Sequence, residues 1–563
     1  MVRRFFPLLA LPFAAMPFAC SSSDAAAPTP CACAASGAGG AAGTGGTAAG
    51  GSAGAAAGAG VGGSADAGAG GTDSSHGPFT PPKYAPGAKP TEVTFPPSFL
   101  FASASAGEQA EKGLAANDWT AWAGTPGHIA NGDIPDNGPD FFAHVDGDVQ
   151  AMKDAKLGAY RFSIELSRLY PTRAAFDADM PDADGVAKYE SLLVKLKAAG
   201  VVPMVTLNHF AFPTWMSDVQ KPGEKQGWER DDAVAVFTEF SKRMAARWGK
   251  YVDLWITINE PNVQSSVGYL LGIWPPGVSD AERMVEVQRQ QVRAHAKAYD
   301  AIHLADTIDA DGDGKAALVS MAFHQRVYLA KDPQNPDDVA AADHATYFWN
   351  YWYLNALVKG DLDYDFDEKL DHPKDLTASP DLAGRLDFIG LNYYGVSITS
   401  AKAIMIPYMG RQPSQSNLPT KAPKTAMGWD IHPQGFGEVI DQLAPFKLPI
   451  FITENGVAQE ASEPTRARFL AEHLFEVGWA IARGADVRGY AYWALTDNFE
   501  WQSGYCPKFG LYTVDYASPA RTRTPAAGRD ELAKIATARK IATSDIDALA
   551  GYPAMPAKTC KAF

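Results

Sequence analysis

The chain has 563 residues, of which 46% are apolar and 11% aromatic, so it is long enough to bury a sizeable core. Its formal net charge of −15 argues against nucleic acid or an anionic membrane surface as the main partner. We interpret the acidic balance mainly as a contribution to solubility.

The N-terminal residues have the order of parts of a secretory signal. Arg3 and Arg4 precede an uncharged stretch that ends at Ala19, and Cys20 follows it. This stretch is too short to span a bilayer as a helix. We predict a signal peptide over 1–19 of the lipoprotein type, with Cys20 acylated after cleavage and the protein held at the outer membrane or cell surface of a bacterium. Simple export to the periplasm or the medium is the alternative.

Residues 20–88 are dominated by Ala, Gly, Ser and Thr. Such a composition cannot bury enough apolar surface to offset the entropy of ordering, so we predict a disordered tether there. A single large domain is predicted over 89–563. Export permits disulfides, and Cys506 with Cys560 is a candidate pair that would pin the C-terminus to the domain.

From about residue 90 onward, short apolar runs alternate with helical stretches, such as the helix predicted over 464–483. Near-continuous apolar strands separated by helices predict a parallel sheet covered by helices. No Gly-rich dinucleotide fingerprint follows the first run, which disfavours an open doubly wound sheet. We therefore predict the α/β class and a (β/α)8 TIM barrel with long insertions. Its eight strands are expected at 98–105, 158–164, 201–209, 252–260, 316–323, 385–394, 448–456 and 487–495.

Two of these runs carry a glutamate at their end, Glu260 in the fourth and Glu454 in the seventh. In a barrel of this kind the active site is built at the carboxyl ends of the strands. Two carboxyl groups on opposite sides of the barrel mouth can act on one bond, one as a proton donor and the other as a nucleophile or base. The alternative is that each glutamate only caps its strand and faces solvent.

The sequences TINEPN and ITENG, which contain these glutamates, closely resemble the two signatures of family 1 glycoside hydrolases, the β-glucosidase-like enzymes. The resemblance spans about residues 95–525, and both motifs fall on predicted strand ends. It implies that Glu260 is the general acid/base and Glu454 the nucleophile. It also implies retention of anomeric configuration through a covalent glycosyl-enzyme intermediate.

The resemblance assigns supporting roles near the two glutamates. Asn259 would hydrogen-bond the 2-hydroxyl of the sugar, a contact that strengthens in the transition state. Arg161 would lie beside Glu454 and keep it ionised. Tyr394 would donate its phenol to the nucleophile, with Asn392 close by.

The same resemblance supplies candidates for recognition of the terminal sugar. Glu500 would repel a substrate that carries a 6-phosphate, which favours a neutral sugar. Groups that would bind hydroxyls are Gln109, His209, Glu500 and Trp501, and Trp493 and Phe509 would form apolar walls.

Four positions depart from the family pattern, namely Glu108, Leu166, Phe210 and Ala494. None of them removes a catalytic group. Together they leave the preferred sugar open among glucose, galactose and fucose.

A separate motif, DADGDGKAALVS, places Asp309, Asp311 and Asp313 at the first, third and fifth positions of a calcium loop. The twelfth position is Ser320 instead of a bidentate glutamate, which disfavours a full EF-hand. The motif predicts either a structural Ca²⁺ site or an acidic turn before the fifth strand.

Together these observations predict an exported retaining β-glycosidase that acts on β-glycosides, most strongly on β-D-glucosides, with side activity on β-D-galactosides or β-D-fucosides. The resemblance implies no organic cofactor and no catalytic metal. Transglycosylation in place of hydrolysis remains open. The alternative from another class is a surface protein that binds glycans on a catalytically inactive barrel.

Overall fold

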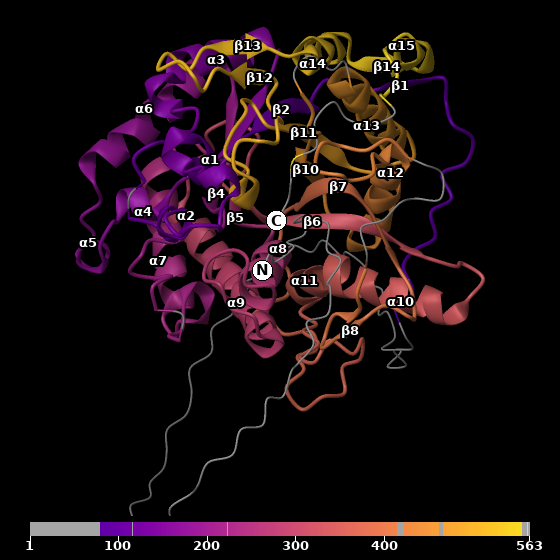
Figure 1. Cartoon of the computed structure of the whole chain (residues 1–563), viewed down its shortest axis with the longest axis horizontal. Helices are drawn as coiled ribbons and strands as arrows, with labels where there is room; N and C mark the ends of the chain where they lie inside the picture. Colours follow the sequence, from indigo (N-terminus) through magenta and orange to yellow (C-terminus); the bar gives the residue numbers. More distant parts are fainter. Residues whose placement is uncertain are drawn as a thin grey trace, which may run out of the picture. The chain divides into compact units, whose positions relative to one another are not determined.

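A computed structural model describes residues 79–114, 116–221, 223–413, 422–460, 465–553 and 560 of the chain. Its centre is a closed barrel of eight parallel strands in the order β10-β11-β2-β3-β4-β5-β6-β7 (Figure 1). The barrel confirms the predicted fold class, and each predicted run overlaps one of its strands. The strands are β2 (Leu100–Ala104), β3 (Ala159–Ser163), β4 (Val202–Asn208), β5 (Leu254–Asn259), β6 (Leu318–Ala330), β7 (Ile389–Thr399), β10 (Ile450–Asn455) and β11 (Val487–Trp493).

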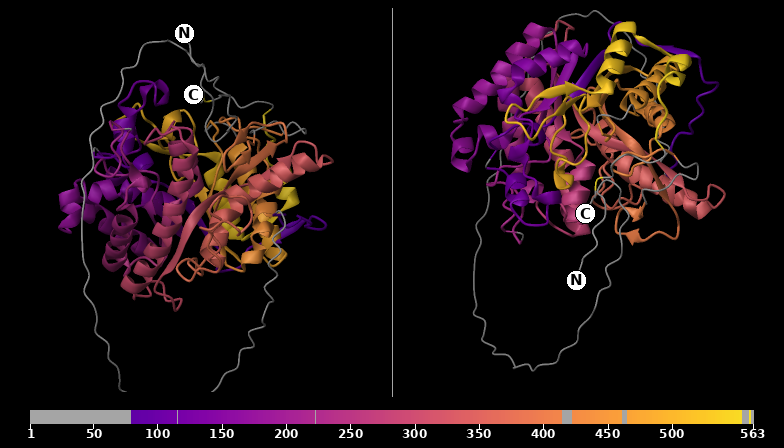
Figure 2. Two further views of the ribbon diagram at one scale, coloured as in Figure 1. Left: turned by 90° about the horizontal axis from the view of Figure 1, so that it is seen from below. Right: turned by 45° about the horizontal axis from the view of Figure 1, so that its top comes forward.

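A major helix follows each barrel strand in the chain, and the ring of helices is visible from two further directions in Figure 2. This alternation is the one that the sequence pattern predicts, and α13 matches the helix predicted over 464–483. The helices are α3 (Val145–Asp154), α6 (Ala183–Ala199), α7 (Ala233–Trp248), α9 (Ala281–Ala305), α10 (Pro336–Thr346), α12 (Pro433–Gln442), α13 (Thr465–Ala482) and α14 (Ala527–Ala538).

The helix α6 illustrates why these segments begin and end where they do. The carboxylate of Asp182 accepts a hydrogen bond from the backbone N–H of Gly185, which satisfies one of the free donors of the first turn. Gly200 ends the helix with a φ of 69°, a left-handed conformation that costs glycine little. The buried side of α6, which includes Tyr189 and Leu193, packs into the main apolar core between the barrel and the helices.

The strands β6 and β7 continue beyond the ends predicted from the sequence. The prediction ended these strands at 323 and 394, but they extend to Ala330 and Thr399 and stay paired as far as those two residues. The extra residues include polar ones such as His324 and Arg326, which the apolar-run criterion excluded. Pairing with a neighbouring strand satisfies the backbone groups there, so the extension needs no apolar run.

Short elements join the two ends of the described chain beside the barrel. The strand β1 (Glu92–Thr94) pairs antiparallel with β14 (Lys540–Ala542), near α13 and α14 (Figure 1). Phe79 contacts the rings of Tyr347 and Tyr351, so attachment to the domain begins before the predicted boundary at 89. Other short elements are α1 (Gly107–Ala110), α2 (Asp118–Ala123), α4 (Leu166–Leu169), α5 (Arg173–Asp177), α8 (Pro261–Ser265), α11 (Trp352–Leu354), α15 (Thr543–Asp547), β8 (Met405–Ile406), β9 (Gly410–Arg411), β12 (Tyr512–Val514) and β13 (Arg523–Pro525).

The predicted signal peptide and most of the predicted tether lie outside the described residues. Among the described helices, none combines the length and apolar character needed to cross a bilayer.

Candidate active site

Glu260 lies directly after β5 and directly before α8, which begins at Pro261. Its backbone has a φ of 42°, a left-handed conformation that is costly for a residue with a side chain and that occurs most often at functional sites. The side chain is buried, and its Oε1 accepts a hydrogen bond of 2.8 Å from Nδ2 of Asn392. The strand end therefore holds this carboxyl group inside the barrel mouth instead of exposing it to solvent.

Glu454 lies near the end of β10 and has a different set of partners. Its Oε1 is 2.7 Å from Nη1 of Arg161, a buried ion pair, and its Oε2 accepts a hydrogen bond of 2.9 Å from the phenol of Tyr394. In the closed barrel of eight strands, β6 and β7 lie between β5 and β10 on the shorter path, so β5 is next to the strand directly opposite β10. The two glutamates therefore face each other across the barrel mouth, as expected from the sequence.

Asn392 connects the surroundings of the two carboxyl groups. Its Nδ2 donates to Glu260 and also lies 3.2 Å from Oδ1 of Asn259, while its Oδ1 accepts a hydrogen bond of 2.6 Å from Thr453. The orientation of this amide follows from Asn259, because the atom of Asn259 that accepts from Arg161 must be its oxygen and the group of Asn392 that faces that oxygen must be the NH₂. Arg161 completes the network by donating to Oδ1 of Asn259 at 2.6 Å.

The two carboxyl groups differ in how strongly their surroundings favour ionisation. Burial and then the charge of Glu454 raise the pKa of Glu260 to about 8. Burial also raises the pKa of Glu454, but Arg161 and the hydroxyl of Tyr394 oppose that effect. Glu454 is therefore the group that ionises first, and Glu260 keeps its proton at neutral pH.

An aromatic wall adjoins this network. The ring of His209 lies nearly parallel to Trp493, with centroids 5.7 Å apart, and to Trp501, with centroids 6.1 Å apart. Asn259 lies 3.1 Å from Nε2 of His209, which links the wall to the carboxyl pair. Phe509 meets the ring of Tyr394 edge-on at 6.4 Å.

Two further predicted residues border the wall. Nε1 of Trp493 donates a hydrogen bond of 3.1 Å to Glu500, and burial raises the pKa of Glu500 to about 8. Gln109 donates to the backbone carbonyl of Phe499 at 2.8 Å. Gln109 thus binds the residue directly before Glu500, which places it next to the wall. Within the described part of the chain, Oε1 of Gln109 and Nδ1 of His209 are buried without a hydrogen-bond partner, as expected of groups that receive a polar ligand.

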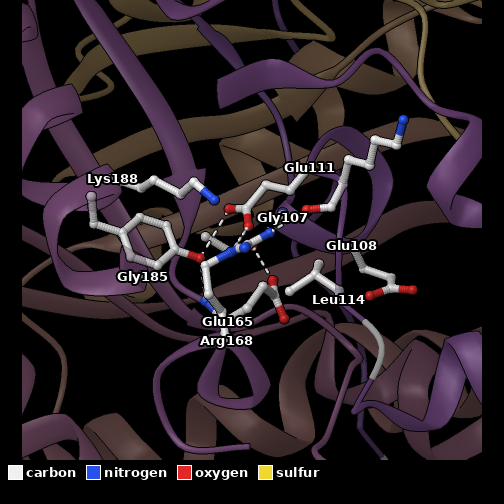
Figure 3. Close-up of polar contacts among 12 residues, drawn as sticks. Gly107, Glu108, Glu111, Leu114, Glu165, Arg168, Gly185 and Lys188 are labelled. Atoms are coloured by element: carbon white, nitrogen blue, oxygen red, sulfur yellow. Dashed lines mark hydrogen bonds and ion pairs between the residues drawn. The ribbon is translucent and has the colours of Figure 1, made fainter. Parts of the chain in front are cut away.

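A buried group of carboxyl side chains includes two from α1 and its end, Glu108 and Glu111, and Glu165 after β3 (Figure 3). Nε of Arg168 donates to Glu111 at 2.6 Å, and Ser163 donates to Glu165 at 2.7 Å. Burial, reinforced by nearby carboxylates, raises the pKa of Glu165 to about 8 and that of Glu108 well above its ordinary value. The sequence analysis noted Glu108 only as a departure from the family pattern and did not anticipate this group.

Cys506 and Cys560 form a disulfide with a Cα–Cα distance of 5.6 Å. Cys560 is buried in an apolar cluster that includes Trp493 and Phe509, and its backbone N–H donates to the carbonyl of Ala426 at 2.9 Å. The disulfide thus attaches the end of the chain to the residues that form the aromatic wall.

The predicted calcium loop lies before β6, at the opposite end of the strand from the site. The structure groups Asp309 and Asp311 with Asp253. Asp313 is not part of that group, so its prediction as a calcium ligand was wrong. Asp309 accepts hydrogen bonds from the backbone of Gly312 and Gly314. Backbone donors thus satisfy this carboxylate, as in an acidic turn.

Sequence reasoning missed Thr206, His324 and Arg326. Thr206 on β4 accepts a hydrogen bond of 2.9 Å from Nε of Arg161 and so helps to orient it. His324 stacks on Tyr394 with centroids 6.1 Å apart. The polar residues 324–326 directly follow the fifth apolar run, and active-site residues of such barrels lie at the carboxyl ends of strands. The same reasoning that identified Glu260 could therefore have identified His324 and Arg326.

An eight-stranded parallel barrel with two buried, differently tuned carboxyl groups at its carboxyl end is the arrangement that glycoside hydrolases use. Comparison with known proteins specifies the family. Residues 91–540 match the family described as glycosyl hydrolase family 1, and the chain belongs to that family. Family 1 glycosidases need no cofactor.

The alignments with curated relatives cover nearly the whole length of those relatives. A β-galactosidase of Pyrococcus woesei is 30% identical over 488 residues, which cover 76% of this chain and 94% of that protein. β-Glucosidase A of Acetivibrio thermocellus is 31% identical over 451 residues, which cover 76% and 95%. The solved structure of a β-glycosidase from Pyrococcus horikoshii superposes with a TM-score of 0.68 at 29% identity, covering 80% of this chain and 96% of that one.

Proposed function

We propose that this protein is a retaining β-glycosidase that hydrolyses terminal non-reducing β-D-glucosyl residues, and also β-D-galactosyl or β-D-fucosyl residues, by double displacement. Glu454 is the nucleophile and Glu260 the acid/base. The observation that carries the proposal is the asymmetry of the two buried carboxyl groups: an ion pair and a phenol favour the charged form at Glu454, whereas burial keeps Glu260 protonated.

In the first step a carboxylate oxygen of Glu454 bonds to the anomeric carbon while the bond from that carbon to the leaving oxygen breaks. Glu260 gives its proton to the leaving oxygen. Glu454 is then an ester and carries no charge. Because that charge is one of the causes that raise the pKa of Glu260, its loss lowers the pKa and leaves Glu260 suited to act as a base.

In the second step a water molecule loses a proton to the carboxylate of Glu260 and attacks the anomeric carbon. The bond between that carbon and Glu454 breaks, so the sugar leaves with its original configuration. Arg161 stabilises the departing carboxylate through the ion pair at 2.7 Å.

The sugar itself is held by the network around the carboxyl pair. Asn259 binds the 2-hydroxyl, and its orientation is set by Arg161 and Asn392. The names of the relatives, which include β-glucosidases and β-galactosidases, support glucosyl and galactosyl substrates. The other hydroxyls are bound by Gln109, His209, Glu500 and Trp501, between the walls formed by Trp493 and Phe509.

We also propose that the protein is exported as a lipoprotein with Cys20 acylated and with 20–88 as a tether. The disulfide between Cys506 and Cys560 supports an oxidising compartment. Labelling of the expressed protein with a radioactive fatty acid tests acylation, and a Cys20→Ser variant that keeps the label would refute it.

Hydrolysis of aryl β-glucosides and β-galactosides by wild type and Glu454→Ala tests the main proposal. We expect the variant to lose activity by about three orders of magnitude or more and Glu190→Ala, at an exposed surface glutamate, to keep it. Equal rates in wild type and Glu454→Ala would remove that residue from the mechanism. Absence of activity in both, with retained sugar binding, would favour a glycan-binding protein on an inactive barrel.

Proton NMR of the first product distinguishes retention from inversion. The β-anomer should appear first and then mutarotate, whereas initial formation of the α-anomer would refute double displacement.

A further inference from the structure

Glu108 is a buried carboxyl group directly before Gln109, the proposed sugar ligand in α1. It stands at one of the four positions where the chain departs from the family pattern, and the proposed reaction gives it no role. The side chains of Glu108 and Gln109 are both fully buried. Removal of a carboxyl group from water is costly, so the partners of Glu108 indicate what it does there.

Asn117 is the hydrogen-bond partner of this carboxyl group. Its Nδ2 donates to Oε2 of Glu108 and also to the carbonyl oxygen of Leu114 at 2.9 Å. The amide of Asn117 has one orientation, because its Oδ1 accepts a hydrogen bond of 2.7 Å from the backbone N–H of Thr120. Asn117 therefore offers Glu108 a donor whose position is fixed.

Asn117 also belongs to a second part of the sugar site. It is the N-cap of α2, and it is buried. Trp119 in α2 packs against the ring of Trp501, with centroids 4.4 Å apart. Trp501 is one of the residues proposed to bind the sugar hydroxyls, so Asn117 is linked through α2 to the aromatic wall.

Asp118, the residue after Asn117, is bonded to the segment that follows His209. Its backbone N–H donates to the carbonyl of Phe212, and its carboxylate accepts a hydrogen bond from the N–H of Phe212, each at 2.9 Å. The contact between Glu108 and Asn117 therefore joins α1 to two other parts of the proposed sugar site.

The second oxygen of Glu108, Oε1, is buried and has no hydrogen-bond partner within the described residues. Burial and the charge of the nearby Glu165 hold the pKa of Glu108 well above its ordinary value, so this carboxyl group keeps its proton at neutral pH. Figure 3 shows the group directed away from the contact between Arg168 and Glu111. Because Oε2 accepts from Asn117, the proton belongs on Oε1, and the group has the shape and hydrogen bonding of an uncharged amide.

The helix α1 has four residues and makes few internal hydrogen bonds, so its position depends on contacts with its neighbours. One attachment is the backbone N–H of Gly107, which donates to the hydroxyl of Ser163 at 2.7 Å. The other is the contact of Glu108 with Asn117. Gln109 follows directly, and a shift of α1 would move its amide with it.

We propose that Glu108 is a positioning residue for sugar recognition, whose hydrogen bond with Asn117 fixes α1 so that the amide of Gln109 meets the terminal sugar. The inference rests on the proposed function, because it takes Gln109 as a sugar ligand. Loss of this contact should raise KM more than it lowers kcat, since Glu260 and Glu454 keep their own partners.

The test is a double-mutant cycle on Glu108 and Gln109, measured as kcat/KM for 4-nitrophenyl β-glucoside. Glu108→Leu removes the acceptor and leaves the N–H of Asn117 unpaired, so it should lower kcat/KM by about tenfold. In the background of Gln109→Ala the same change should alter kcat/KM by less than about twofold, because there is no amide left to displace. A residue that only supports folding would lower kcat/KM by the same factor in both backgrounds.

Two further variants complete the comparison. Glu108→Gln keeps an oxygen for Asn117 and places an NH₂ where the protonated acid has its hydroxyl, so it should restore kcat/KM to within about twofold of wild type. The matched control is Glu531→Leu, at a buried glutamate in α14, which should leave kcat/KM unchanged in both backgrounds.

Equal effects of Glu108→Leu in the two backgrounds would overturn the inference, and so would a loss in Glu108→Gln as large as that in Glu108→Leu. If Gln109→Ala alone leaves kcat/KM unchanged, the inference is also wrong, and hydrolysis by the wild type shows that the proposed function stands without it.

Two provisions keep the test decisive. Should Glu108→Leu fail to fold, Glu108→Asp, whose shorter side chain withdraws the oxygen from Asn117, takes its place in the cycle with the same expected and contrary results. A wild type that does not hydrolyse the substrate would contradict the proposed function, and the same cycle measured as affinity for glucose by calorimetry then tests the inference.

Discussion

Replacement of Glu260 by glutamine removes the proton that the leaving oxygen needs while keeping the size of the side chain. Because burial and the charge of Glu454 raise the pKa of Glu260 to about 8, this group is protonated in most free enzyme molecules at pH 6. Asn392 can still pair with the new amide oxygen, so the network around the site should persist. The loss is therefore chemical, and general acid catalysis contributes about 10² to 10⁴ in rate.

The size of this loss should depend on the leaving group. For alkyl β-glucosides, whose alkoxide leaves poorly, we expect Glu260→Gln to lower kcat/KM by about 10² to 10⁴. For 2,4-dinitrophenyl β-glucoside, whose phenolate leaves without protonation, kcat/KM should change little. Its kcat should fall instead, because the second step loses its base.

The pH dependence gives an independent assay of the same residue. Since the acid must be protonated, wild-type kcat/KM for alkyl glucosides should fall as the pH rises through about 8, and this limb should be absent in Glu260→Gln. Measurement of both substrates from pH 5 to pH 10 covers the range. Wild-type rates for the variant on alkyl glucosides, or an alkaline limb that persists in the variant, would refute the assignment.

Four further predictions follow from the structure. Arg161→Met should move the acid limb of the kcat/KM profile to higher pH, because the cation of Arg161 lowers the pKa of Glu454 and its removal raises that pKa; an unmoved limb would contradict this. Thermal stability should fall as the pH rises from about 5 to 8, because the folded-state pKa of Glu165 lies near 8, above its ordinary value, and Glu165→Gln should flatten that slope in calorimetric melts. Cys560→Ser opens a loop with a sequence separation of 54 and should lower the free energy of unfolding by up to about 4 kcal/mol, which denaturant titration measures against wild type. Removal of divalent ions with a chelator should leave the melting midpoint unchanged, since backbone donors satisfy the aspartate loop before β6, and a lowered midpoint would reveal a bound ion.

The barrel and the main polar network were predictable because each depends on local pattern. An apolar run in a covered parallel sheet is buried on both faces, so its ends are marked by the first polar residues, as at Glu260 and Glu454. The same rule failed where pairing continued without an apolar run, which hid the extension of β6 to Ala330. His324 lies in that extension, so it was not predicted as a site residue.

Other features depend on distances that no local pattern contains. Asp253, directly before β5, joins Asp309 and Asp311 in the loop before the neighbouring strand β6, and its sequence neighbours give no sign of that partnership. The buried pair Glu108 and Glu165 comes from two different strand-end segments, and each glutamate alone has the appearance of a surface residue in the sequence. Their burial follows from how α1 packs against β3, which is a property of the whole barrel.

The disulfide between Cys506 and Cys560 makes the quality of a protein preparation dependent on where it was produced. Material expressed in a reducing cytoplasm will have the correct sequence but will lack the covalent attachment of Cys560 to Cys506, beside the cluster that contains Trp493 and Phe509. Two laboratories that assay the same polypeptide can then measure different substrate preferences. A count of free thiols should therefore accompany every kinetic comparison of this enzyme and its variants.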